Sequence, residues 1–222
     1  QLDQTLQARL MRPAQRGFVR AQDVACARGT IAPVRGQRQR AAPPFRRLEK
    51  EGYKIQAVAG TSFGGIVAVF YAAGHPINEI EDMFAGLDQA SLYGHSPEQA
   101  PSLLGLAGAA KWLKEVFGEK TFADLKLPCA VTAVDLRCGC EVVLSEGPVV
   151  DAILATVAVP GVLPHVHINE WELVDGGVLN PVPVSVARSL APKLPVVAVV
   201  LTEPLGVPAR TWTLPVPHLL PR

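Results

Sequence analysis

From residue 45 onward, the hydrophobic positions form two kinds of segment. Short continuous apolar runs, typical of buried strands, alternate with longer runs that have helical spacing. Strands are predicted at residues 55–59, 129–135, 141–144, 172–174 and 196–201. Helices are predicted at residues 45–52, 63–73, 77–87, 109–117, 149–157 and 183–190, and a loop or lid at 88–108. This alternation predicts an α/β fold with a central, mostly parallel sheet and helices on both faces.

The two ends of the chain lack this order. Residues 1–47 hold ten arginines and two acidic residues, a net charge of +8, whereas residues 48–222 carry −7. An arginine-rich arm could bind nucleic acid or anionic lipid, or serve as a transit peptide. We favour a loosely ordered, solvated segment and expect no nucleic-acid partner. We therefore predict a poorly patterned segment at 1–44, a folded domain at 45–201 and an irregular, proline-rich tail at 202–222.

Length and composition fit a globular protein. With 222 residues, 49% of them hydrophobic, the chain can bury a sizeable core. No apolar run approaches the roughly 20 residues that span a bilayer, and the N-terminus lacks a signal-peptide pattern. We expect a cytoplasmic protein with peripheral contact to a membrane at most.

The cysteines and histidines give only weak signs of further chemistry. Cys138-Gly-Cys140 falls at a predicted hairpin turn, and we expect free thiols throughout. His165-x-His167 places two imidazoles on one side of an extended segment, a weak sign of a metal. Because further ligands at suitable spacing are lacking in the sequence, we expect no metal and no cofactor.

The turn between residues 55–59 and 63–73 carries the most specific chemistry. The segment Gly60-Thr-Ser62-Phe-Gly64 places a serine between two glycines, with an apolar strand before it and an apolar helix after it. Glycine allows a sharp reversal that lifts the serine oxygen to the carboxyl edge of the sheet. The N-terminus of the next helix then favours negative charge at that oxygen. This pattern predicts a nucleophile elbow with Ser62 as nucleophile, and a plain Gly/Ser turn is the alternative.

A serine hydroxyl needs a base, because it is a poor nucleophile at neutral pH. Histidine is the usual base, and only His165 and His167 follow the serine in a suitable strand-end region. Asp175 is a different candidate, since it lies between a short apolar strand and two glycines, Gly176 and Gly177. A carboxylate held away from water beside the serine could accept the hydroxyl proton directly. A β-turn is the alternative interpretation of Asp-Gly-Gly.

Three segments together resemble the patatin-like phospholipase family, and more narrowly its bacterial members related to the neuropathy-target-esterase catalytic domain. They are Gly60-Thr-Ser62-Phe-Gly64, Ala155-Thr-Val-Ala-Val-Pro160-Gly-Val-Leu-Pro164 and Asp175-Gly-Gly177-Val-Leu-Asn-Pro181-Val-Pro183. The resemblance is continuous from residue 45 to about residue 201 and implies a three-layer α/β catalytic domain. It also implies a Ser62–Asp175 dyad without histidine, which hydrolyses phospholipids, lysophospholipids or other acyl esters through an acyl-enzyme, with no metal or cofactor.

We also expect supporting roles for the residues around the dyad. Gly60 and Gly64 would let the elbow form. Gly176 and Gly177 would let the aspartate loop close on the elbow, and Asn180 would hold that loop.

The resemblance fails at one feature of the family, a glycine-rich loop before the elbow whose backbone N–H groups form the oxyanion hole. Residues 24–44 contain no glycine run, and Pro43-Pro44 should break the helix that follows the loop. We therefore leave the oxyanion hole unassigned and expect the first strand and first helix of the sheet to be lost. A reading-frame disruption or a replaced segment up to about residue 44 would explain the change, and the tail after residue 202 could be a second one. An intact upstream frame in the source gene would refute this explanation.

Three hypotheses follow. The first is an active serine lipid acyl hydrolase that uses the Ser62–Asp175 dyad. The second is a catalytically impaired pseudoenzyme, a lipid-binding or interaction module that keeps the pocket without an oxyanion hole. The third is a Ser-His-Asp esterase that uses His165 or His167.

Overall fold

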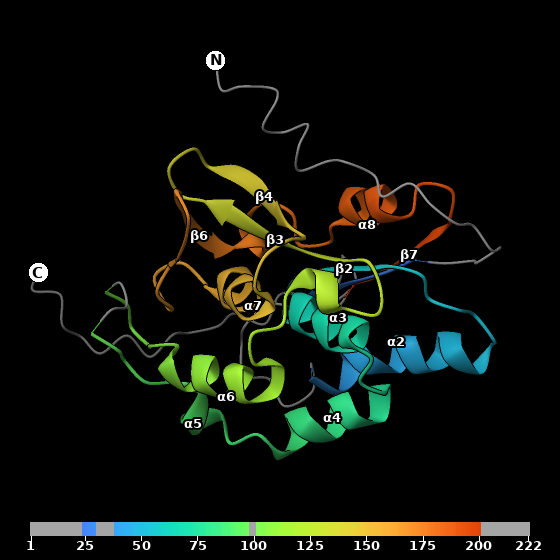
Figure 1. Cartoon of the computed structure of the whole chain (residues 1–222), viewed down its shortest axis with the longest axis horizontal. Coiled ribbons are helices and arrows are strands. Elements are labelled where there is room, and N and C mark those ends of the chain that lie inside the picture. The colour runs from blue at the N-terminus through green and yellow to red at the C-terminus, as the bar shows by residue number, and fades with distance from the viewer. Residues whose placement is uncertain (1–23, 30–37, 98–100, 201–222) are drawn as a thin grey trace, which may run out of the picture.

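The computed structural model describes residues 24–29, 38–97 and 101–200 (Figure 1). The strands are β1 (Val24–Gly29), β2 (Val58–Ser62), β3 (Cys129–Asp135), β4 (Cys140–Leu144), β5 (Val166–Ile168), β6 (Trp171–Asp175) and β7 (Val196–Val199). The α-helices are α2 (Arg38–Lys50), α3 (Phe63–Ala73), α4 (Ile77–Gly86), α5 (Gln89–Leu92), α6 (Ala107–Phe117), α7 (Val149–Val157) and α8 (Val184–Leu190). Two 3-10 turns, η1 (Phe122–Asp124) and η2 (Gly176–Val178), complete these elements.

The strands of the described residues form one seven-stranded sheet in the order β5-β6-β3-β2-β1-β7, with β4 paired to β3. The strands β7, β1, β2 and β3 are parallel to one another, β4 and β6 pair antiparallel with β3, and β5 pairs antiparallel with β6. Parallel strands place their carboxyl ends at one edge of the sheet, so the end of β2 lies where the fold can build a site.

Helices cover both faces of this sheet, which confirms the predicted three-layer α/β class (Figure 1). Around β2 the side chains alternate between the two layers, as a period of two requires. Val58 packs into the large cluster formed with α3, α4, α6 and α7, whereas Ala57 and Ala59 pack against α8 on the opposite face. The strand that carries Ser62 is therefore buried on both faces, and its end is held firmly.

The expected loss of the first strand is wrong. The strand β1 lies between β2 and β7 and pairs with both in parallel register, with Gly29 opposite Ser62. The physical reason is that the backbone N–H and C=O groups along the facing edges of β2 and β7 need hydrogen-bond partners. The short run Val24–Gly29 lies between the two strands and supplies these partners. The domain boundaries stay predictions, because residues 1–23 and 201–222 lie outside the described part of the chain.

The expected break of the first helix at Pro43-Pro44 is also wrong, since α2 continues through both prolines. Tertiary contacts after the prolines outweigh the lost backbone hydrogen bonds. Phe45 is buried, with its ring 4.8 Å from the ring of Tyr71 on α3. Arg46 forms an ion pair with Glu81 on α4. These contacts dock α2 on the helical layer.

The other elements differ from the predictions mainly at the loops. Within the predicted loop at 88–108, the structure has the short helix α5 and the start of α6, joined by a bridge between Gly94 and Leu106. The strand β5 was not predicted as a separate strand, and it forms a hairpin with β6. Among the described residues, no helix has the length and apolar character that crossing a bilayer requires.

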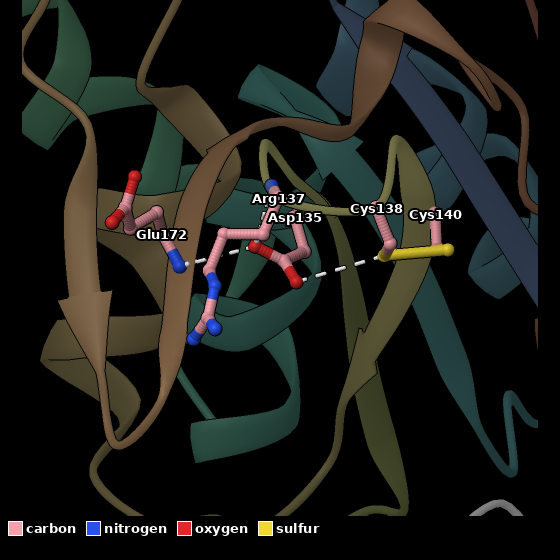
Figure 2. Close-up of a disulfide and its surroundings, with 5 residues drawn as sticks. All are labelled: Asp135, Arg137, Cys138, Cys140 and Glu172. Carbon is pink, nitrogen blue, oxygen red and sulfur yellow. Dashed lines mark hydrogen bonds between the residues drawn. A yellow bond between two sulfur atoms is a disulfide. The ribbon is translucent and has the colours of Figure 1, made fainter. Parts of the chain in front are cut away.

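The expectation of free thiols throughout is wrong for the β3–β4 hairpin, where Cys138 and Cys140 form a disulfide (Figure 2). The tight hairpin turn brings their Cα atoms to 5.2 Å, within bonding reach. Asp135 braces the same turn, because its Oδ1 atom accepts hydrogen bonds from the backbone N–H groups of Arg137 and Glu172. This carboxylate thus links the hairpin to β6, the strand that ends at Asp175.

Candidate active site

The sheet brings two strand ends together along one edge of β3. The strand β4 pairs with β3 from Val131 to Asp135, which leaves the opposite edge to β2 and β6. On that edge the last residue pair between β2 and β3 is Thr61 with Thr132, and β6 arrives from the other direction with Asp175 opposite Ala133. Because residues 132 and 133 are neighbours, the ends of β2 and β6 meet head to head. This topology explains how residues 113 positions apart in sequence come into contact.

The side chains of Ser62 and Asp175 meet at this junction. Ser62 Oγ donates a hydrogen bond of 2.6 Å to Asp175 Oδ2. Both residues are buried, with exposed fractions of 1% and 5%. A hydroxyl-to-carboxylate bond of this length lies in the range of charge-assisted hydrogen bonds. The arrangement can therefore pass the serine proton directly to the carboxylate.

Ser62 has a backbone conformation that side chains rarely adopt. Its φ is 56° and its ψ is −130°, and α3 begins at the next residue. Such a conformation costs on the order of 1–3 kcal/mol and is typical of functional sites. The turn is also very tight, because a Cβ atom at Gly60 would lie 2.2 Å from the carbonyl oxygen of Gly64. The predicted strand–turn–helix context of the Gly-x-Ser-x-Gly segment is thus present.

The loop after β6 orients the aspartate. Asp175 Oδ1 accepts a hydrogen bond of 2.7 Å from the backbone N–H of Gly177, and the Asp175 N–H donates to the carbonyl oxygen of Ala158. A Cβ atom at Gly176 would lie 2.5 Å from Thr132 O, so the loop packs directly on the backbone of β3. With Oδ1 bound by its own loop, Oδ2 is the oxygen that faces Ser62.

Three threonines surround the pair and were not predicted as site residues. Thr61 Oγ1 lies 2.6 Å from Thr132 Oγ1 and donates to the carbonyl oxygen of Asn180. Thr156 Oγ1 accepts a hydrogen bond of 2.9 Å from the Ser62 N–H and donates to Thr132 O at 2.6 Å. The described chain has six buried polar or charged side chains, and five of them belong to this cluster. Buried polar groups are costly unless they are paired, so the cluster marks a specialised part of the core.

The sequence offered a partial signal for these threonines. Thr156 lies inside the segment 155–164 that carries part of the family resemblance, but a threonine in an apolar helix also fits plain core packing. Thr61 and Thr132 lie in strands, where their β-branched side chains are common. Their hydrogen bonds depend on the register between β2 and β3, which the sequence pattern does not specify.

The two histidines considered as bases lie on the edge strand hairpin. His165 and His167 face each other, with their Nε2 atoms 3.1 Å apart. Asn180 extends its side chain to Glu141 on β4 at 2.7 Å. Within the described part of the chain, no group of three or more His, Cys, Asp or Glu side chains is placed to hold a metal ion.

A model of the patatin-like phospholipase family matches residues 42–188, about two thirds of the chain. This match includes Ser62, Asp175 and the threonine cluster. The chain belongs to the patatin-like phospholipase family. The relationship predicted from the three sequence segments is thus confirmed, and the disrupted glycine-rich loop stays a prediction.

Relatives in the family agree with the narrower resemblance. An uncharacterised NTE family protein of Mycobacterium tuberculosis is 31% identical over 144 residues, which cover 64% of this chain and 39% of the relative. The protein YqhO of Bacillus subtilis is 28% identical over 192 residues, which cover 72% of this chain and 66% of that protein. The chain therefore spans well under half the length of the mycobacterial relative.

The fold is similar to the crystal structure of VipD from Legionella pneumophila. The TM-score is 0.55 at 11% sequence identity, and the match covers 72% of this chain and 46% of VipD. At this identity the similarity supports the patatin-like fold alone.

Proposed function

We propose that this chain is a serine lipid acyl hydrolase, with Ser62 as the nucleophile and Asp175 as its general base. The observation that carries the proposal is the buried hydrogen bond of 2.6 Å from Ser62 Oγ to Asp175 Oδ2. This bond supports the proposal because the proton of the proposed nucleophile could pass directly to the proposed base, without a histidine between them.

The proposed reaction has two halves. Ser62 Oγ attacks the ester carbonyl carbon while its proton moves to Asp175 Oδ2, and a tetrahedral intermediate forms. When this intermediate collapses, the bond to the alcohol oxygen breaks and Asp175 returns the proton to the leaving alcohol. A water molecule then attacks the acyl-enzyme and gives a proton to Asp175, which passes it back to Ser62 as the fatty acid leaves.

The tetrahedral intermediate needs hydrogen-bond donors for its negative oxygen, and the first turn of α3 supplies candidates. The N–H groups in the first turn of a helix have no partner within the helix, and α3 begins at Phe63 without a side-chain cap. In α/β-hydrolases the N–H after the nucleophile is one such donor. The residues where the family places its glycine-rich loop include 30–37, which lie outside the described residues, so the rest of the oxyanion hole stays unassigned.

The surface beside the dyad supports a lipid substrate. Val178 and Leu179 directly follow the aspartate loop and are 59% and 54% exposed. Apolar side chains at the rim of a site can contact an acyl chain or the surface of a lipid aggregate. We propose a phospholipid, lysophospholipid or related acyl ester as substrate, with peripheral contact to the membrane.

Hydrolysis of p-nitrophenyl butyrate by the purified 222-residue chain tests this function. We expect turnover that Ser62→Ala abolishes and that Asp175→Asn lowers by about 10²- to 10⁴-fold, the usual contribution of a general base. The double variant His165→Ala, His167→Ala is the matched control and should retain wild-type turnover. Loss of turnover in the control would favour the Ser-His-Asp esterase.

A folded but inactive wild-type chain would contradict the proposal in another way. It would mean that the elbow persists without a working oxyanion hole, and the pseudoenzyme hypothesis, a lipid-binding or interaction module, would replace it.

A further inference from the structure

We infer that Thr156 on α7 is a positioning residue, whose hydroxyl holds the backbone of Ser62 in the conformation that aims Oγ at Asp175. The inference rests on the proposed function for its effect on catalysis. It also gives a physical role to the segment 155–164, which the proposed reaction does not otherwise use.

The hydrogen bonds at Thr156 have a fixed direction. A threonine hydroxyl has one proton to donate, and the structure places it on Thr132 O at 2.6 Å. The Ser62 N–H therefore donates its hydrogen bond to a lone pair of Thr156 Oγ1, with 2.9 Å between the nitrogen and the oxygen. Both Thr156 and Thr132 are fully buried, so water does not readily replace either partner.

Ser62 needs such support because its backbone conformation is strained. With φ at 56°, the residue relaxes toward ordinary backbone angles unless its surroundings prevent it. Because φ is the rotation about the N–Cα bond, relaxation would turn the peptide plane that carries the N–H relative to the Cα–Cβ bond that carries Oγ. The N–H would then leave Thr156 Oγ1, or Oγ would move away from Asp175 Oδ2. The bond to Thr156 opposes this rotation, because a Ser62 N–H that left it would be buried without a known partner.

The same hydroxyl ties the elbow to the aspartate loop. It donates to Thr132 O, the backbone atom against which Gly176 packs. Gly65 allows the close approach of α7, since a Cβ atom at that residue would lie 2.9 Å from Thr156 Cγ2. One side chain thus fixes the nucleophile strand, the β3 backbone and the loop of the base relative to each other.

Two substitutions isolate the hydroxyl. Thr156→Val keeps the shape and removes both hydrogen bonds, whereas Thr156→Ser keeps the hydroxyl and removes the methyl group. Ile153→Val, a buried change on the same helix, is the control for a general loss of packing in α7. Each variant is compared with wild type by turnover of p-nitrophenyl butyrate, by the labelling rate of a fluorophosphonate probe, and by amide hydrogen exchange at residues 58–65.

We expect Thr156→Val to lower kcat and the labelling rate by about 10- to 100-fold, with KM changed by less than about threefold, as for a group that acts through the nucleophile. Amide exchange at Ser62 should become about tenfold faster, because its hydrogen bond is lost. Thr156→Ser should recover most of the rate and the protection, and Ile153→Val should change neither.

Wild-type kinetics in folded Thr156→Val, or no recovery in Thr156→Ser, would overturn the inference. If the wild-type chain neither hydrolyses the ester nor is labelled by the probe, the proposed function fails. Amide hydrogen exchange at Ser62 then still decides the inference. Unchanged exchange in Thr156→Val would then refute the positioning role.

Discussion

Replacing Gly176 by alanine tests how closely the aspartate loop must pack on β3. The added methyl carbon would lie 2.5 Å from Thr132 O, whereas ordinary contacts begin at 3.4 Å, so the two backbone segments must separate by about 0.9 Å. Asp175, the adjacent residue, must move with the loop. A displacement of about 1 Å at a reacting group can cost about 10²-fold in rate, which is about 2.7 kcal/mol of activation free energy.

The assay is the turnover of p-nitrophenyl butyrate by Gly176→Ala, together with urea unfolding. We expect kcat to fall about 10²-fold and the free energy of unfolding to fall by about 1–3 kcal/mol, the usual cost of overpacking. Gly86→Ala is the matched control, because a Cβ atom at Gly86 would have no heavy atom within 4 Å. A Gly176→Ala variant with wild-type kcat and stability would refute the close packing of this loop.

Three further predictions concern the scaffold. Phe70 is fully buried and its ring contacts Trp112 on α6, so Phe70→Ala should lower the free energy of unfolding, measured by urea titration, by about 3–5 kcal/mol. A loss below about 1 kcal/mol would contradict the packing of α3 on α6. The disulfide closes a loop with a sequence separation of only two, so replacing Cys138 and Cys140 by serine should lower the free energy of unfolding by no more than about 2 kcal/mol, and a larger loss would show a role beyond loop closure. Hydrogen bonds from the backbone and the hydroxyl of Thr121 lower the pKa of Asp124, so its stabilisation is present above the ordinary aspartate pKa of about 3.9 and disappears as pH falls through the lowered value. Asp124→Asn should therefore lower Tm at neutral pH and lose this effect in acid, and a Tm difference that does not change with pH would refute it.

The layers of the fold could be predicted because their signals are local. The apolar run before Ser62, the glycines of the turn and the apolar helix after it together specify a strand, a tight turn and a helix. The pairing of β1 could not be predicted, since it depends on the neighbours β2 and β7 rather than on a strong apolar pattern of its own. The continuation of α2 through its prolines likewise depends on contacts with α3 and α4.

The candidate site was predictable to the level of its two central residues. The motifs around Ser62 and Asp175 named both, and the structure places their oxygens 2.6 Å apart. The contribution of Thr156 was not predictable, because it needs the position of α7 relative to β2, which emerges only from tertiary packing. The disulfide was missed because a sequence with two cysteines in a turn is compatible with two free thiols and with a disulfide. The backbone geometry of the hairpin decides between the two states.

The most direct test of the central proposal, a Ser–Asp dyad without histidine, is the rate at which a fluorophosphonate probe labels Ser62, with the labelled residue identified by mass spectrometry. The dyad predicts that Ser62 of the wild-type chain is labelled. It also predicts that Asp175→Asn slows labelling by at least about 10²-fold, and that the double variant His165→Ala, His167→Ala is labelled at the wild-type rate. Labelling that survives in Asp175→Asn but is lost in the double histidine variant would contradict the account.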